Sequence, residues 1–222
     1  MSSLTHEDII KATAAFVETS LSTAEGGHDW WHIYRVWKNA LHILEHEQGA
    51  DRLIVELGAL LHDIADSKFY EGDEEIGPRT ARAFLESLEL DEYLIEQVEQ
   101  IIRHISFKGS LSEEERWTSP ELMIVQDADR LDAIGAIGIA RTFNFGGFKG
   151  RPLYDPHIAP NLGMSKDEYK KNDSPTLNHF YEKLLLLKDK MNTATGKKIA
   201  EDRHRFMEQY LEQFYAEWEG AR

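Results

Sequence analysis

The chain of 222 residues contains no cysteine, which excludes disulfide bonds, thiolate metal ligands and cysteine nucleophiles. No apolar run approaches the length needed to cross a membrane. The N-terminus lacks the cationic segment and following apolar run of a signal peptide. Glycine-rich phosphate-binding fingerprints and a Ser-His-Asp order are also missing. We therefore expect a cytoplasmic protein without a membrane partner.

Positive charge is scarce: the chain has 25 Lys and Arg residues and 40 Asp and Glu residues, which gives a formal net charge of -15. Binding of long nucleic acid usually requires a basic surface, so that partner is excluded. A small anion is still a possible ligand if a few cationic side chains gather at one place. The 41% of hydrophobic residues suffice for a core, and we expect one domain over residues 1–222, compatible with a homodimer.

Apolar residues recur at helical spacing, and alternating strand patterns are nearly absent. We predict an all-α fold of about eight helices, the first capped by Thr5 with Asp8. The predicted helices span roughly 5–20, 29–44, 51–64, 78–88, 91–102, 120–141, 175–191 and 199–218. The segment 143–173 has several Gly and Pro residues and no steady period, which predicts a long loop near the functional site.

Four residues in three predicted helices point to a metal site: His32, the doublet His62-Asp63, and Asp129. His32 precedes Val36 by one helical turn, and Asp129 follows Val125 by one turn, so both side chains face apolar sides. A buried carboxylate is costly unless it is paired or bound to a metal. Two imidazoles and two carboxylates suit a divalent cation that leaves room for water and phosphate oxygen.

Spacing alone leaves other interpretations open for each of these residues. A single His on an apolar face is often a hydrogen-bonded core residue. A second His-Asp doublet occurs at His28-Asp29, and Asp129 next to Arg130 could form an ion pair.

The residues around the four positions resemble the HD superfamily of metal-dependent phosphohydrolases over nearly the whole chain. The resemblance implies a helical bundle with a metal between its core helices, held by His32, His62, Asp63 and Asp129, with Asp129 preferred over its neighbours Asp127 and Asp132. It is carried by the stretches HDWWHIYRVWKNA, ELGALLHDIADSKF, RHISFKG and VQDADRLDAIGAIGIARTF, and by the C-terminal sequence from LNHFYEKL onward.

The same resemblance implies one divalent metal ion, with manganese favoured and magnesium, cobalt, nickel or iron as alternatives. The chain is similar to a bacterial branch of small enzymes that hydrolyse nucleoside or deoxynucleoside triphosphates to pyrophosphate and a monophosphate. A phosphomonoesterase for nucleoside monophosphates is the nearest alternative, and a nucleotide-sensing module without turnover is another. A diiron oxygenase is disfavoured, because beyond His104 the additional histidines of two-metal subgroups are not evident.

Three further residues are candidates for catalysis. Asp66 follows Asp63 by three residues and could orient or deprotonate the attacking water, or it could cap a helix end. His28 lies four residues before His32 and could protonate the leaving group, or it could bond within a loop. His104 could contact phosphate or fix a bound water, or belong to the core.

Several cationic and polar residues are candidates for binding a nucleotide, because cations stabilise the charge on phosphoryl oxygens. A solvated surface role is the alternative for each. The candidates are Arg35, Lys108, Lys149, Arg151, Asn178, His179 and Lys183.

Overall fold

The computed structural model describes residues 4–22, 29–65, 73–105, 117–163 and 173–221. Every regular element within these ranges is a helix and none is a strand, which confirms the predicted all-α fold class. No described helix is both long and apolar enough to pass through a bilayer. The chain divides into two compact units, Met1–Asp129 and Arg130–Arg222. That the whole chain forms one domain stays a prediction.

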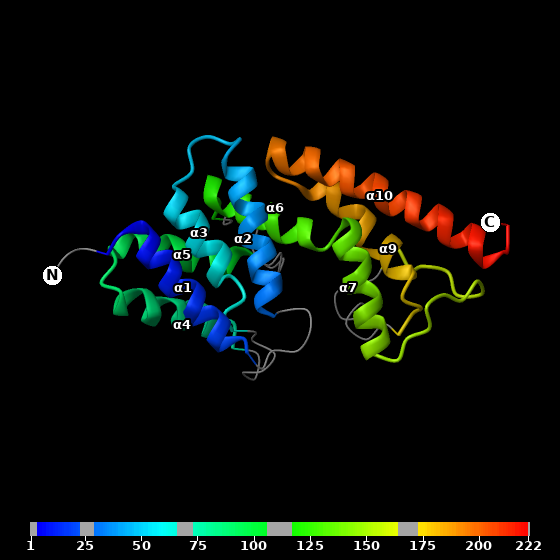
Figure 1. Ribbon diagram of the computed structural model, residues 1–222, viewed down its shortest axis with the longest axis horizontal. Coiled ribbons are helices and arrows are strands. Elements are labelled where there is room, and N and C mark those ends of the chain that lie inside the picture. The colour runs from blue at the N-terminus through cyan, green and yellow to red at the C-terminus, as the bar shows by residue number, and fades with distance from the viewer. Residues whose placement is uncertain (1–3, 23–28, 66–72, 106–116, 164–172, 222) are drawn as a thin grey trace. The chain divides into compact units, whose positions relative to one another are not determined.

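The first unit is a set of helices packed around α3 (Figure 1). Its helices are α1 (His6–Ser20), α2 (Trp30–Leu44), α3 (Arg52–Leu61), α4 (Ile76–Ser87), α5 (Glu92–Ile105) and most of α6 (Pro120–Asp132). Helix α3 contacts α1, α2 and α5, and every residue from Ile54 to Leu61 is buried. A helix that is apolar all round belongs in a core, so the chain that leaves its C-terminal end starts from a buried position.

Side-chain caps fix where these helices begin. Thr5 and Asp8 form the predicted capping box at the start of α1. The carboxylate of Asp51 accepts hydrogen bonds from the backbone N–H groups of Leu53 and Ile54, at 2.8 and 3.1 Å, and so begins α3. The backbone N–H of Asp51 donates to the carboxylate of Glu121 at 2.8 Å, which ties the start of α3 to α6.

Helices α3 and α5 approach closely at Gly58. A Cβ atom added at Gly58 would lie 3.0 Å from Cδ1 of Ile101, which is tighter than ordinary side-chain packing. Alanine at this position would therefore require the side chain of Ile101 to shift by a few tenths of an ångström.

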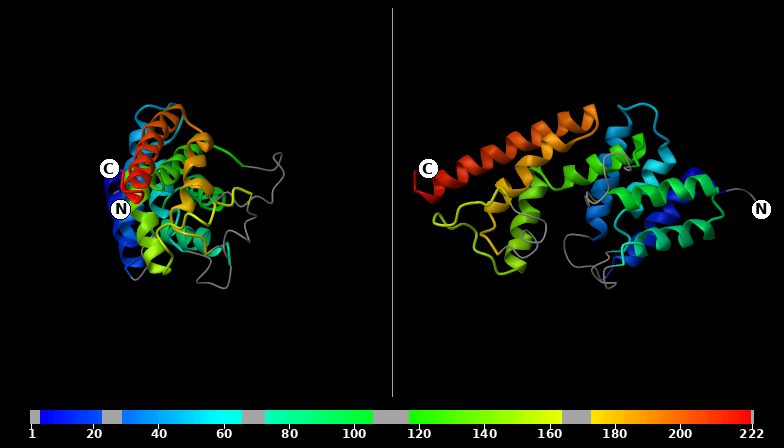
Figure 2. Two further views of the ribbon diagram at one scale, coloured as in Figure 1. Left: turned by 90° about the vertical axis from the view of Figure 1, so that its right-hand side faces the viewer. Right: turned by 180° about the vertical axis from the view of Figure 1, so that it is seen from behind.

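The second unit contains the end of α6 and four further described elements. They are α7 (Gly135–Phe148), α9 (Asn178–Glu182), the 3-10 helix η3 (Leu184–Lys190) and α10 (Ala194–Trp218). Helix α10 packs against α7 and η3, and Figure 2 shows this unit from a second side. Thr193 caps α10 by accepting a hydrogen bond from the backbone N–H of Gly196 at 2.9 Å.

The prediction of one helix over 120–141 is wrong, because α6 ends at Asp132 and α7 starts at Gly135. Gly135 has a φ of 74°, a left-handed conformation that glycine adopts at little cost. A Cβ there would also lie 3.0 Å from the side chain of Arg203. The apolar spacing continues across this break, so periodicity alone did not reveal it.

The predicted loop over 143–173 begins later than expected, because α7 continues to Phe148. Gly146 and Gly147 lie inside this helix. A Cβ at Gly146 would lie 2.2 Å from Oγ1 of Thr176, so this glycine serves close packing. The described segment over 149–163 is irregular, and the position of the predicted loop near the functional site stays a prediction.

The helix predicted over 175–191 is also wrong in detail. The chain forms the short α9 and then the 3-10 helix η3, with Lys183 between them at φ -144° and ψ -56°. Leu184 and Leu187, three residues apart, are both buried. A spacing of three fits both 3.0 and 3.6 residues per turn, so the sequence pattern could not separate the two.

Candidate metal centre

His32 owes its position to the cap of α2. The carboxylate of Asp29 accepts a hydrogen bond from the backbone N–H of His32 at 2.9 Å and so caps the start of α2. His32 then lies one helical turn before the buried Val36. The ring of His32 therefore enters the core, where 1% of the residue is exposed. Asp29 of the second His-Asp doublet is thus a helix cap, and its partner His28 lies outside the described residues.

His62 follows the last residue of the buried helix α3 and is itself 5% exposed. Its Nδ1 lies 2.9 Å from the carbonyl oxygen of Ala59. A carbonyl only accepts, so Nδ1 carries a hydrogen, and Nε2 is the nitrogen left to act as an acceptor. That Nε2 is buried and has no hydrogen-bond partner among the described residues. A bare buried acceptor is costly, and a cation would satisfy it.

The donor atoms of all four predicted ligands converge. Nε2 of His32 lies 3.7 Å from a carboxylate oxygen of Asp63 and 3.5 Å from one of Asp129. Nε2 of His62 lies 3.8 and 4.0 Å from the same two oxygens. Ligands about 2.1 Å from a shared ion lie roughly 3 to 4 Å apart, so this spacing fits a divalent cation. His32, His62 and Asp129 form one of the described groups compact enough to hold a metal.

The centre is buried on one side and open on the other. Both imidazole side chains are 2% exposed, whereas the side chains of Asp63 and Asp129 are 31% and 41% exposed. Buried rings hold the geometry fixed, and partly exposed carboxylates leave an approach for water and for a phosphate oxygen.

The neighbouring aspartates have other environments. Asp132 is 1% exposed, and its carboxylate accepts a hydrogen bond from Arg141 at 2.5 Å. Asp127 is completely buried. Asp129 is the member of this run whose carboxylate reaches the two histidines.

Of the three candidate catalytic residues, His104 is described and the other two are not. Nδ1 of His104 lies 2.9 Å from the carbonyl oxygen of Gln100, and its ring lies 5.7 Å from that of Trp117. These contacts fit a packed residue of α5, and its catalytic role stays a prediction. Asp66 and His28, like Lys108 among the binding candidates, lie outside the described residues.

The second unit brings three of the predicted binding residues into one electrostatic environment. The pKa of His179 falls to about 4, first because the ring is buried and then because Lys183 and Arg151 repel its charged form. His179 is therefore neutral at physiological pH and sits beside two cations. Such a group of cations suits an anion.

Two further cationic candidates, Lys149 and Arg35, are among the described residues. Lys149 is exposed, and its Nζ lies 5.7 and 5.4 Å from the ring centres of Phe145 and Phe148. Arg35 is half-buried on α2, three residues after His32. Contact of either residue with a phosphate stays a prediction.

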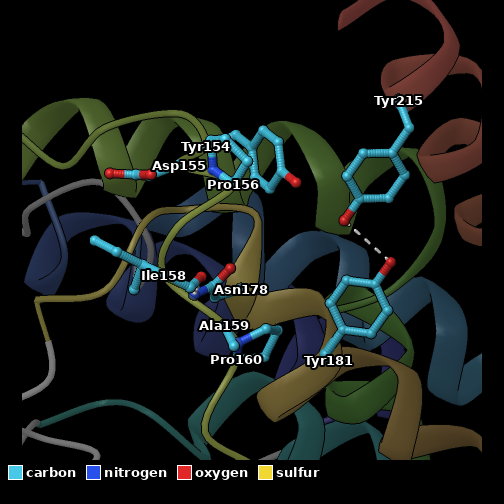
Figure 3. A pocket seen from close by; sticks show the side chains of 9 residues that line it. All are labelled: Tyr154, Asp155, Pro156, Ile158, Ala159, Pro160, Asn178, Tyr181 and Tyr215. Carbon is cyan, nitrogen blue, oxygen red and sulfur yellow. Dashed lines mark hydrogen bonds between the residues drawn. The ribbon is translucent and has the colours of Figure 1, made fainter. Parts of the chain in front are cut away.

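Asn178 lines a pocket of about 400 Å³ in the second unit (Figure 3). Its amide nitrogen donates to the carbonyl oxygen of Ile158 at 3.0 Å, which holds the irregular segment against α9. The hydroxyl groups of Tyr181 and Tyr215 face each other 3.2 Å apart across the pocket wall. The volume is that of a small-molecule site, while contact of Asn178 with a base stays a prediction.

Comparison with known proteins establishes the family. Residues 30–134 match the family model described as the HD domain. The chain is 41% identical to the uncharacterized protein YpgQ of Bacillus subtilis over 209 residues, which cover 89% of this chain and 88% of YpgQ. The chain therefore belongs to the HD-domain family, and the matched range contains all four residues of the metal centre.

Solved structures agree in fold. An HD-superfamily hydrolase of Bacillus thuringiensis is 46% identical with a TM-score of 0.77, and the match covers 97% of this chain and all of the other. The structure of Bacillus subtilis YpgQ in complex with ADP gives a TM-score of 0.77 at 36% identity, with 96% of this chain and 97% of the other covered. The chain is thus an HD-superfamily protein whose relatives include hydrolases.

Proposed function

We propose that this protein is a metal-dependent phosphohydrolase that cleaves nucleoside or deoxynucleoside triphosphates to a monophosphate and pyrophosphate. The observation that carries the proposal is the convergence of His32, His62, Asp63 and Asp129 around a buried nitrogen of His62 that has no hydrogen-bond partner among the described residues. These residues would hold one divalent ion, with manganese favoured because imidazole and carboxylate ligands both suit it. Magnesium, cobalt, nickel and iron are the alternatives.

When bound, the ion supplies an activated water and positive charge for the phosphoryl oxygens. The protein orients the ligands for it. The Ala59 carbonyl fixes the ring of His62 with Nε2 directed to the centre, and the Asp29 cap fixes the helical turn that carries His32. The two carboxylates balance the charge of a divalent ion, so the site binds the cation without a net charge in the core.

Asp66 is proposed to position the attacking water. This role rests on the sequence, because Asp66 follows the ligand Asp63 by three residues and lies outside the described ranges. His28 is the candidate for protonating the leaving group, and His104 is a candidate for contacting phosphate or fixing a bound water.

A nucleotide is favoured as the substrate on two grounds. A relative, Bacillus subtilis YpgQ, has been crystallised in complex with ADP, a nucleoside that carries two phosphates. This chain has a net charge of -15, yet its second unit gathers Arg151 and Lys183 beside the neutral His179. Local cations on an acidic protein are the means by which a polyphosphate would be attracted. Action on free nucleotides in the cytoplasm, and a homodimeric state, remain predictions.

A product screen tests the proposal. Purified protein is incubated with each nucleoside and deoxynucleoside mono-, di- and triphosphate in the presence of Mn²⁺, Mg²⁺, Co²⁺ or Ni²⁺, and phosphate and pyrophosphate are measured separately. We expect pyrophosphate from triphosphates. Phosphate from monophosphates would identify the phosphomonoesterase alternative. Binding of a nucleotide without any product would identify a sensing module.

A further inference from the structure

A second group of metal-binding side chains lies at the other end of α2. His42, Glu45 and His46 each offer a ligand atom, and these atoms lie within 4.8 Å of one another. His42 is ten residues beyond His32, which corresponds to about 15 Å along a helix. The group is therefore separate from the candidate metal centre, although the same helix carries both.

The spacing of the three residues places them on one face of the last turn. Residues three and four apart on a helix are neighbours, so His42 faces both Glu45 and His46. The two imidazole ring centres are 5.1 Å apart. All three side chains are exposed and can rotate by the small amount that brings their ligand atoms to bonding distance from one ion.

Hydrogen bonding prepares His46 as a ligand. Its Nδ1 lies 2.9 Å from the carbonyl oxygen of His42, which can only accept. The hydrogen is therefore on Nδ1, and Nε2 keeps a free lone pair. His62 in the candidate metal centre is prepared in the same way by the carbonyl of Ala59. A ligating histidine whose second nitrogen donates to a carbonyl is the common arrangement at metal sites.

The surrounding field also favours a cation. The C-terminal end of a helix carries a partial negative charge, and Glu45 is the residue that caps α2. The carboxylate of Glu45 adds a full negative charge, and the chain as a whole is at -15. Two imidazoles with one carboxylate favour zinc, nickel, cobalt or copper over magnesium, which prefers oxygen ligands alone.

We propose that His42, Glu45 and His46 form a second, surface site for a divalent transition-metal ion, independent of the candidate metal centre. Three protein ligands leave at least one coordination position to water. Because its ligands are exposed, this site exchanges its ion more readily than the buried centre. The signal in the sequence is HILEH, two histidines four residues apart with a glutamate between them.

Equilibrium dialysis of untagged protein against Zn²⁺ tests the proposal. We expect two ions per chain for the wild type and one for His46→Gln. The matched control His157→Gln changes another exposed histidine and should keep two ions. His62→Gln should keep the surface ion and lose the buried one, and Mg²⁺ should not occupy the surface site.

A spectroscopic measurement identifies the ligands. With Co²⁺ or Cu²⁺ bound to the His62→Gln protein, we expect a signature of two nitrogen ligands that disappears when His46→Gln is added. Equal stoichiometry for wild type and His46→Gln, or equal loss in His157→Gln, would overturn the proposal. One ion that is lost in His46→Gln and kept in His62→Gln would support this site while contradicting the proposed function.

Discussion

The two compact units present their polar groups in different ways. In Met1–Asp129, capped helices bring His32, His62, Asp63 and Asp129 to one centre with both imidazoles buried. In Arg130–Arg222, the candidate binding residues come from an irregular segment and a short helix, and the lining of the pocket is rich in tyrosine and proline. The first arrangement suits fixed geometry at an ion. The second suits recognition of a charged or aromatic ligand.

We expect the largest effect from Asp63→Ala, which removes one of two carboxylates that would balance the ion. The protein should lose both the metal and its hydrolytic activity, while its helical content remains. Metal content and pyrophosphate release are measured on the same sample. Asp189→Ala, which changes an exposed aspartate of the second unit, is the control and should retain both. An Asp63→Ala protein with full metal content and turnover would contradict the ligand assignment.

The second effect concerns Asp66→Asn, which keeps size and polarity and removes basicity. If Asp66 positions or deprotonates water, kcat should fall by roughly 10²- to 10⁴-fold while metal content and Tm are retained. If it is only a helix cap, Asn should replace it well and turnover should barely change. Unchanged turnover would transfer the role to His104 or His28.

In the second unit, His179 predicts a pH dependence of stability. Its pKa is about 4 in the folded protein and about 6.5 when unfolded, so between these values the unfolded state binds more protons. Stability is therefore lost as pH falls from 6.5 to 4, by on the order of 2 kcal/mol from this group. His179→Gln should remove that part of the loss. Urea unfolding at pH 4.5 and 7 measures it, with His157→Gln as the control.

Arg151→Gln combined with Lys183→Gln should weaken binding of a triphosphate. If both cations contact the phosphates, their loss should raise KM by about tenfold, equivalent to about 1.4 kcal/mol, with a smaller change for an ester with an uncharged leaving group. Lys188→Gln, which removes a cation paired with Asp189, is the control. Equal kinetics for both substrates in the double variant would leave these cations with a packing role.

Features set by neighbouring residues could be predicted from the sequence. The N-terminal caps of three helices are Thr5, Asp29 and Asp51. With these caps, α1, α2 and α3 start within a residue or two of the positions predicted from the sequence. Helical spacing indicated that His32 and Asp129 face apolar sides. That the four candidate ligands meet at one metal was predicted from the resemblance to the HD superfamily, because spacing alone left other interpretations open.

Features set by contacts between residues far apart in the chain could not be predicted from the sequence. A Cβ at Gly135 would meet the side chain of Arg203, and a Cβ at Gly146 would meet Thr176, both far along the chain. The environment of His179 depends on burial and on Arg151, which precedes it by 28 residues. Periodicity reports the buried face of one helix and carries no information on such partners.

The most direct test of the candidate metal centre is a crystal structure of the protein grown with Mn²⁺, with anomalous diffraction recorded to locate the ion. We predict one anomalous peak about 2 Å from Nε2 of both His32 and His62 and in contact with the carboxylates of Asp63 and Asp129. No peak at this position, or an ion held there by other residues, would contradict the assignment.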